Sequence, residues 1–287
     1  MTRVACIGEA MIELSMTGED AQLGVAGDTL NTAIYLHRMA PELTVDYVSC
    51  VGDDPFSVRI MDFASQQGIG ISAIRQITGM SPGLYAITTT PDGERSFTYW
   101  RSASAARHLF ADLDFSVLAR YDAIYLSGIS LAILPQPVRV AFLDWLNASP
   151  VKLIYDSNYR PRLWESIENA RQITSAMWKR ADVALPSIDD EMALFEETAA
   201  QVSARFAARG GVGALKRGAD GPMSLGCAVS QSYPTVSKVA DTTAAGDSFN
   251  GGYLAALLTG GSQADALMAG HQLAATVVQH RGAIMPA

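Results

Sequence analysis

The chain has 287 residues, of which 49% are hydrophobic and 17% are charged, and its formal net charge is −8. This length and composition are typical of one large globular α/β domain, or of one domain with a small appendage. The acidic balance argues against a nucleic-acid partner, which would favour a basic face. No uninterrupted apolar stretch is long enough to cross a bilayer, so we expect no membrane partner.

The first residues, Met1–Gly8, predict a strand that enters a glycine turn. They lack the separate apolar segment and the cleavage site of a signal peptide. The three cysteines, Cys6, Cys50 and Cys227, lie in apolar, strand-like contexts without metal-ligand spacing. This pattern favours reduced, buried thiols and a cytoplasmic protein.

Strand-like apolar runs alternate with helical patterns for most of the chain. The order predicts a mostly parallel sheet with helices on both faces. In chain order we expect strand Val4–Ile7, helix Thr29–Met39, strand Asp46–Val51, helix Pro55–Gly68, strand Ala123–Leu126, helix Val138–Asn147, strand Leu153–Asp156, helix Ile167–Ala181, strand Val183–Pro186, helix Asp189–Ala208, strand Val212–Lys216, and helices at about Gly246–Leu258 and Gln263–His280.

One region breaks this alternation. Leu84–Thr90 and Ser96–Trp100 both have strand character, and the turn signal Pro91–Glu94 separates them. An antiparallel hairpin within a parallel α/β chain predicts a lid over a binding site. A further strand at Ile12–Met16 could join it.

The most informative segment runs from Asp241 to Tyr253. The small residues Ala244, Ala245 and Gly246 precede a helical pattern, and they leave backbone N–H groups open at the helix start. Such a start attracts anions, phosphate above all. A bound phosphate would repel the Asp247 carboxylate, unless that carboxylate accepts the proton of a hydroxyl that attacks phosphorus. The alternative is an ordinary helix start with an acidic first turn.

This segment resembles the C-terminal signature of the ribokinase-like (PfkB-type) sugar kinases. The resemblance implies that Asp247 is the catalytic base and that Ala244, Ala245 and Gly246 form the anion hole for ATP. It also implies a three-layer α/β/α fold with a mostly parallel central sheet. We therefore expect a single kinase domain over residues 1–287, with a small β lid from about residues 10–24 and 83–104. Because such lids often form the dimer contact, we expect a homodimer or a higher homo-oligomer.

Residues 26–31 precede the first predicted helix, where Asp28 or Thr29 could simply cap it. The sugar-binding motif of the family falls at the same place, which implies that Gly27, Asp28 and Asn31 hold sugar hydroxyls. In contrast, we interpret Gly52-Asp53-Asp54 as turn and cap chemistry.

The predicted lid carries Tyr85 on its first strand, with Tyr99 and Arg101 on one face of the second. An arginine and two tyrosines there suit a substrate with a carboxylate and hydroxyls. The alternative is a hairpin with exposed polar residues and one aromatic packing face.

The run Tyr155–Trp164 follows a predicted core strand, at the end of the sheet where ligands bind in open α/β folds. Arg160 and Arg162 place positive charge there, although surface arginines beside a proline turn are the alternative. The run resembles those of 2-keto-3-deoxygluconate kinases and, more loosely, fructokinases. This resemblance implies ATP-dependent phosphorylation of the 6-hydroxyl of that sugar acid, with Asn158 and Arg160 on the substrate. A kinase for a neutral sugar (fructokinase or ribokinase) and a non-catalytic sugar-binding relative remain alternatives.

The family resemblance also implies nucleotide and metal sites. The basic turn after strand Val212–Lys216 would lie along ATP, although it could also be a plain hairpin turn, and His271 would lie near the adenosine. Asp190 or Glu191 would organise Mg²⁺, since Ser187 and Asp190 replace the usual Asn and Glu of that motif. Asp241 and Thr243 match positions that hold a monovalent cation in many members of the family, which implies a K⁺ site. The turn residues are Lys216, Arg217, Gly218, Ala219, Asp220 and Gly221.

Overall fold

An eight-stranded sheet forms the centre of the computed structural model, which describes residues 2–17, 20–89 and 95–286. Its strand order is β12-β11-β10-β9-β8-β1-β4-β5, and neighbouring strands pair in parallel except β11 with β12. The mostly parallel sheet predicted from the alternating pattern is therefore confirmed. The strands are β1 (Arg3–Ile7), β4 (Thr44–Val51), β5 (Gly70–Gln76), β8 (Ala123–Ser127), β9 (Lys152–Asp156), β10 (Val183–Leu185), β11 (Val212–Leu215) and β12 (Met223–Leu225).

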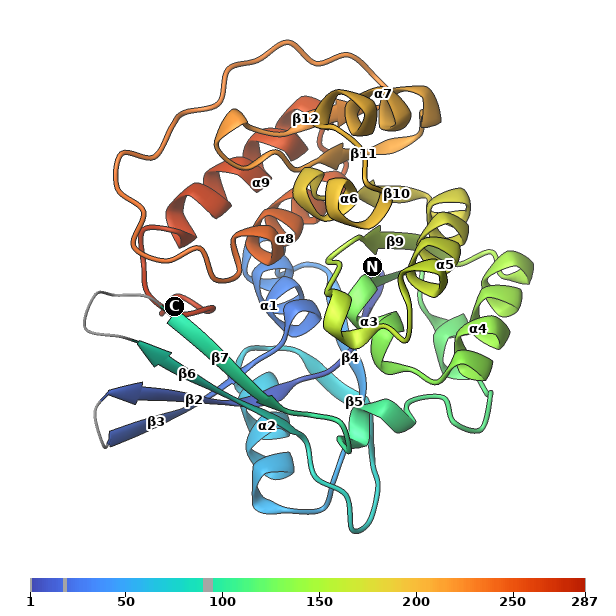
Figure 1. The fold of residues 1–287 in the computed structure, drawn as a ribbon, viewed down its shortest axis with the longest axis vertical. Helices are drawn as coiled ribbons and strands as arrows, with labels where there is room; N and C mark the ends of the chain where they lie inside the picture. Colours follow the sequence, from blue (N-terminus) through green and yellow to red (C-terminus); the bar gives the residue numbers. More distant parts are fainter. Residues whose placement is uncertain (1, 18–19, 90–94, 287) are drawn as a thin grey trace.

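Helices cover both faces of this sheet, as Figure 1 shows. Successive residues of a strand point to opposite faces, so Val4 and Cys6 pack into one core while Ala5 and Ile7 pack into the other. The first core includes α1 (Asp28–Met39), α2 (Pro55–Gln66), α8 (Ala245–Leu258) and α9 (Gln263–Val277). The second includes α3 (Gly128–Ile133), α4 (Gln136–Ala148), α5 (Ile167–Arg180), α6 (Ile188–Phe195) and α7 (Ala199–Arg209).

A four-stranded sheet with the order β3-β2-β6-β7 forms the smaller layer. It consists of β2 (Met11–Thr17), β3 (Asp20–Ala26), β6 (Gly83–Thr89) and β7 (Arg95–Trp100). The predicted hairpin is confirmed, because β6 and β7 pair antiparallel, and β2 joins them by pairing in parallel with β6. The predicted turn Pro91–Glu94 lies outside the described residues. Ala283 packs with Met11 and Tyr85, so the C-terminal segment lies against this sheet (Figure 1).

Several elements differ from the prediction. The expected helix 189–208 is two helices, because Glu196 adopts a left-handed conformation (φ 57°) and Thr198 begins α7 with a reciprocal cap to Gln201. Strands β3, β5 and β12 and helix α3 were not predicted. Short 3₁₀ helices at Ala105–His108, Ser116–Arg120, Pro161–Leu163 and Gly218–Asp220 complete the described elements.

Two smaller expectations have different outcomes. The Gly52–Asp54 turn acts as predicted, since the Asp54 side chain caps α2 by accepting hydrogen bonds from the N–H groups of Phe56 and Ser57. The expectation of buried thiols holds for Cys6 and Cys50, but it is wrong for Cys227, which is exposed. Cys227 follows β12 in a segment without strand structure, so no layer covers it.

Candidate active site

A pocket of about 1330 Å³ opens at the carboxyl ends of the central strands. Parallel α/β sheets bind ligands at this edge. Its lining residues come from several elements. They are the smaller sheet, the start of α1, the ends of β9 and β11, the starts of α6 and α8, and one side of α9. Among the lining residues are Asp28, Asn31, Tyr85, Tyr99, Arg101, Asn158, Arg160, Asp190, Lys216, Ala244, Ala245, Gly246, Asp247 and His271. The fold therefore brings candidate residues from separate parts of the sequence to one cavity.

The start of α8 has the geometry of an anion site. Ala244 precedes the helix in a left-handed conformation (φ 60°), and Gly246 and Asp247 lie in its first turn. Within the described part of the chain, the N–H groups of Gly246 and Asp247 donate no backbone hydrogen bond. Two free amides at the positive end of a helix dipole suit a phosphate group.

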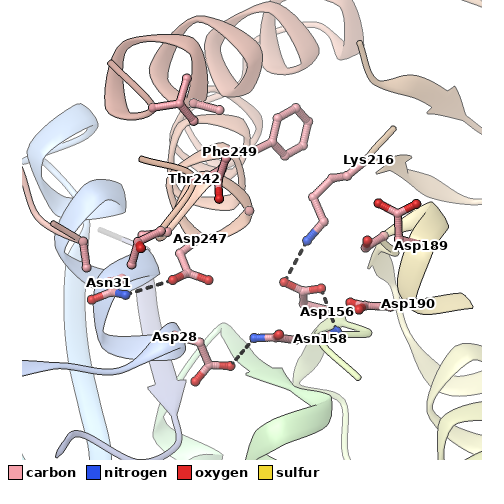
Figure 2. Close-up of a pocket in the computed structure, with 18 of the residues that line it drawn as sticks. Asp28, Asn31, Asp156, Asn158, Asp189, Asp190, Lys216, Thr242, Asp247 and Phe249 are labelled. Carbon is pink, nitrogen blue, oxygen red and sulfur yellow. Dashed lines mark hydrogen bonds and ion pairs between the residues drawn. The ribbon is translucent and has the colours of Figure 1, made fainter. Parts of the chain in front are cut away.

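Asp247 faces the pocket beside these amides (Figure 2). Its Oδ2 accepts a hydrogen bond of 2.9 Å from the side-chain amide of Asn31. Burial, followed by the negative charges of Asp28 and Asp156, raises the pKa of Asp247 to about 8, although Asn31 and Lys216 oppose the rise. A carboxyl group with a pKa in this range can accept a proton at neutral pH and hold it.

The residues predicted to bind sugar, Gly27, Asp28 and Asn31, line the same part of the pocket as Asp247. Asp28 accepts hydrogen bonds from the Ser127 hydroxyl and, at 2.7 Å, from the Asn158 side chain. Burial raises the pKa of Asp28. A side chain at Gly27 would lie 2.3 Å from the carbonyl oxygen of Glu9, so this position requires glycine. The acids and amides therefore form two adjacent pairs, Asp28 with Asn158 and Asp247 with Asn31, that present polar atoms to a polyol.

On the smaller sheet, Tyr85 and Tyr99 are direct cross-strand partners, and their rings stack with centroids 5.6 Å apart. The predicted placement of Arg101 is wrong in one respect. β7 ends at Trp100, and Arg101 turns inward to an ion pair with Glu9, whose side chain is 1% exposed. Arg101 lines the pocket, but it is a compensated charge and not the free cation that the sequence suggested. Glu9 was not predicted, although its position directly after the first core strand was a signal.

The two candidates for Mg²⁺ separate in the structure. Asp190 lines the pocket and lies 3.3 Å from the Arg160 guanidinium. Glu191 is fully buried behind it, where it accepts hydrogen bonds from Trp178 at 3.1 Å and from Arg205 at 2.9 Å. The expectation for Glu191 is therefore corrected, because consecutive helical residues point in different directions.

No cluster of three or more His, Cys, Asp or Glu side chains that could hold a metal occurs among the described residues. One pocket carboxylate, Asp190, fits Mg²⁺ all the same, because Mg²⁺ keeps several waters and binds mainly through substrate phosphates.

The basic turn joins the antiparallel strands β11 and β12, so it is a hairpin turn as well as part of the pocket wall. Lys216, Arg217, Gly218 and Ala219 line the pocket. The predictions for Asp220 and Gly221 are not supported, because these two residues do not contribute to the lining. Their carbonyl oxygens instead accept hydrogen bonds from the side chain of Arg217.

At the far end of the pocket, His271 lines the wall, and its place near the adenosine stays a prediction. Its Nε2 lies 2.7 Å from the carbonyl oxygen of Pro234, and its ring centroid is 5.0 Å from that of Tyr233. It therefore holds the segment after β12 against α9.

Asp241 and Thr243 lie just before α8. The Asp241 carboxylate accepts hydrogen bonds from the N–H and the hydroxyl of Thr243 and, at 2.8 Å, from the N–H of Gly282. These contacts connect the anion site to the C-terminal segment. Their role toward a monovalent cation stays a prediction.

Two functional candidates were missed from the sequence. Asp156 lies at the end of β9 and Asn250 one turn into α8, and both side chains are buried against Lys216. The position of Asp156 at a strand end was a signal, but nothing in the sequence showed that Asn250 would face it.

The sheet order, the β lid and the acid at a helix start together define a ribokinase-like α/β/α fold. Residues 1–287 match the pfkB family carbohydrate kinase, and the chain belongs to this family. It is 44% identical to the 2-dehydro-3-deoxygluconokinase of Dickeya dadantii (strain 3937), covering 99% of this chain and 96% of that protein. The enzyme of the same name from Escherichia coli (strain K12) is 43% identical over 99% of this chain and 97% of its own length.

Solved structures show the same fold. A PfkB protein from Polaromonas sp. JS666 superposes with a TM-score of 0.83 and 28% identity, covering 97% of this chain and 96% of that one. The aminoimidazole riboside kinase from Salmonella enterica, complexed with aminoimidazole riboside and an ATP analog, has a TM-score of 0.83 and 20% identity, with 98% and 94% covered. No helix among the described residues has the length and apolar character needed to cross a membrane.

Proposed function

We propose that the protein transfers the γ-phosphoryl group of ATP to the 6-hydroxyl of 2-keto-3-deoxygluconate, which gives 2-keto-3-deoxy-6-phosphogluconate. One observation carries the proposal: Asp247 lies beside the free amides of the α8 start and is hydrogen-bonded to Asn31 of the sugar motif. This geometry supports a site where the acceptor hydroxyl, the carboxylate that takes its proton and the γ-phosphate of ATP would meet. The choice of sugar acid rests on the relatives named 2-dehydro-3-deoxygluconokinase, which are 36–44% identical to this chain.

The proposed step has one bond formed and one broken. The 6-oxygen attacks the γ-phosphorus, the bond from that phosphorus to the β,γ-bridging oxygen breaks, and ADP leaves. The proton of the hydroxyl passes to the Asp247 carboxylate. The protein contributes mainly position and charge stabilisation, because such transition states need little covalent help.

The remaining residues line the two ends of the pocket, where one end would bind the sugar acid and the other ATP. In this proposal the sugar hydroxyls contact Gly27, Asp28, Asn31 and Asn158. The carboxylate end lies under the lid, where both tyrosines and two arginines line the wall. Donors to that end are Tyr85, Tyr99, Arg101 and Arg160.

ATP would extend from α8 toward α9, with its γ-phosphate at Ala244, Ala245 and Gly246. Its phosphate chain would lie along Lys216–Ala219, and its adenosine near His271. Asp190 would hold Mg²⁺ through water, and the ion would neutralise phosphate charge when bound. We further propose that the protein forms a homodimer or a higher homo-oligomer.

A panel of sugar acids and neutral sugars with ATP and Mg²⁺ tests this function through ADP release. We expect rapid turnover with 2-keto-3-deoxygluconate, a 6-phosphate product, and little turnover with fructose or ribose. Asp144→Asn is a matched control, because Asp144 is an exposed carboxylate on α4, away from the pocket. Turnover of fructose or ribose but not of the sugar acid would favour a neutral-sugar kinase. No turnover with any sugar would favour a non-catalytic relative.

A further inference from the structure

Three side chains from distant parts of the chain form a closed triangle at the pocket floor. Nζ of Lys216 lies 2.8 Å from Oδ2 of Asp156, and it donates a 3.2 Å hydrogen bond to Oδ1 of Asn250. Asn250 in turn donates at 2.6 Å to Oδ2 of Asp156. The ends of β11 and β9 and the first half of α8 are thus fixed to one another through polar atoms. The direction of the lysine ammonium is therefore determined by two neighbours.

The ammonium group also faces the anion site. A methyl group on Gly246 would lie 3.7 Å from Nζ of Lys216, so the charge lies next to the first turn of α8. The lysine lines the pocket, and its side chain keeps 12% of its exposure. Figure 2 shows it reaching from β11 toward Asp156, with Asp247 on the opposite side of the opening.

A purely structural ion pair explains this arrangement poorly. Asp156 already accepts hydrogen bonds from Asn250 and, at 3.2 Å, from the N–H of Asn158. Burying an ion pair costs desolvation, and well-packed apolar groups often serve stability as well or better. Meanwhile six acidic side chains line the same pocket, and their negative charge would repel a phosphate group. They are Glu9, paired with Arg101, Asp190 beside Arg160, and Asp28, Asp156, Asp189 and Asp247.

We propose that Lys216 is a catalytic residue that contacts the transferring phosphoryl group, and that Asp156 and Asn250 are positioning residues that aim it. This inference rests on the proposed function. When the 6-oxygen bonds to phosphorus and the bridging oxygen departs, the ammonium stabilises negative charge on the phosphoryl oxygens. The same positive charge opposes protonation of Asp247 and so favours its carboxylate form.

The test measures kcat, both KM values and the pH profile of kcat for the full-length protein with ATP and 2-keto-3-deoxygluconate. For Lys216→Met we expect a fall in kcat on the order of 100-fold or more, and less than about a threefold change in KM for the sugar acid, since the lysine acts at the phosphoryl group. Lys216→Arg keeps the charge, so it should recover much of the rate. Lys152→Met is the matched control, because Lys152 is an exposed lysine at the opposite end of β9 and should behave like wild type.

The pH profile separates this role from a structural one. Losing Lys216 should move the acid limb of kcat to higher pH, because Asp247 then loses its nearby cation. Asp156→Asn removes a negative charge and should move the limb to lower pH while kcat falls. The ionisable groups close enough to interact electrostatically with Asp247 are Asp28, Tyr35, Tyr85, Tyr125, Asp156 and Lys216.

A folding defect in Lys216→Met would not block the test. The double variant Lys216→Met/Asp156→Asn leaves no unpaired charge in the triangle, and it should fold yet stay slow. A Lys216→Met or folded double variant with kcat within about threefold of wild type would overturn the proposal, as would an acid limb that neither single substitution moves. Failure of the wild type to phosphorylate the sugar acid would instead overturn the proposed function itself.

Discussion

The side-chain amide of Asn31 donates a 2.9 Å hydrogen bond to the carboxylate of Asp247, although the two residues are 216 positions apart in the sequence. The bond joins the start of α1 to the start of α8. It fixes the carboxylate toward the place where the sugar motif would present a hydroxyl. Two motifs at opposite ends of the chain therefore act as one unit.

The first prediction concerns the base. Asp247→Asn should lower kcat by about 10²–10⁴-fold, because an amide cannot accept the proton of the hydroxyl. The amide has the same shape, so folding and ATP binding should persist. Steady-state kinetics and ATP titration measure the two effects. Near-normal turnover in a folded variant would end the assignment of Asp247 as the base.

The second prediction concerns stability and pH. The folded-state pKa of Asp247 is about 8, above its ordinary value of 3.8, so the folded protein binds this proton more tightly than the unfolded chain does. The stabilisation is complete below about pH 3.8 and is lost as the pH rises through about 8. Wild type should therefore lose Tm relative to Asp247→Asn between pH 5 and pH 8, by several degrees. Parallel thermal melts measure the difference, and a constant gap across this range would contradict it.

The third prediction concerns the anion site. Gly246→Ala should fold normally, because its φ is not in the left-handed region and the added methyl meets Lys216 only at 3.7 Å. The methyl would nevertheless protrude into the phosphate site, so kcat should fall at least tenfold, as for loss of one stabilising contact. Gly251→Ala is a contrasting variant, since its methyl would lie 2.5 Å from Tyr35 and should lower Tm. A Gly246→Ala protein with unchanged kinetics would argue against phosphate binding at this turn.

The helix start at the candidate anion site was the most predictable feature of the pocket because its signal is local. Ala244, Ala245, Gly246 and Asp247 are consecutive in sequence, and their helix start follows from small residues before an apolar pattern. Strands β3 and β5 escaped prediction because they are largely exposed or half-exposed and mix polar with apolar residues.

Side-chain pairs between residues far apart in the sequence could not be predicted. Glu9 and Arg101 are 92 positions apart, and Asp156 and Asn250 are 94 apart. A sequence pattern places each residue at a strand or helix end, but only the sheet order brings their charges together. For the same reason the sequence suggested a free Arg101, whereas the fold gives it a partner.

The fourth prediction follows from that pairing. Arg101→Gln leaves the buried Glu9 carboxylate without its cation, so it should destabilise the protein by about 3–5 kcal/mol. Glu9→Gln/Arg101→Gln should regain most of this loss, because no buried charge remains. Both variants should lose more kcat/KM with the sugar acid than with fructose, since a guanidinium donor is removed from the carboxylate end. Equal losses on both substrates would contradict a role of Arg101 in carboxylate recognition.

The last prediction separates the two adjacent acids of α6. Asp190 faces the pocket, so Asp190→Asn should raise the Mg²⁺ concentration for half-maximal activity several-fold, because one carboxylate is lost from the ion's water shell. Glu191 accepts hydrogen bonds from Trp178 and Arg205 in the core. Glu191→Gln should therefore cost stability, about 1–3 kcal/mol, with an unchanged Mg²⁺ requirement. Mg²⁺ titrations and denaturant melts on both variants distinguish the residues, and a shift in Mg²⁺ requirement confined to Glu191→Gln would reverse the assignment.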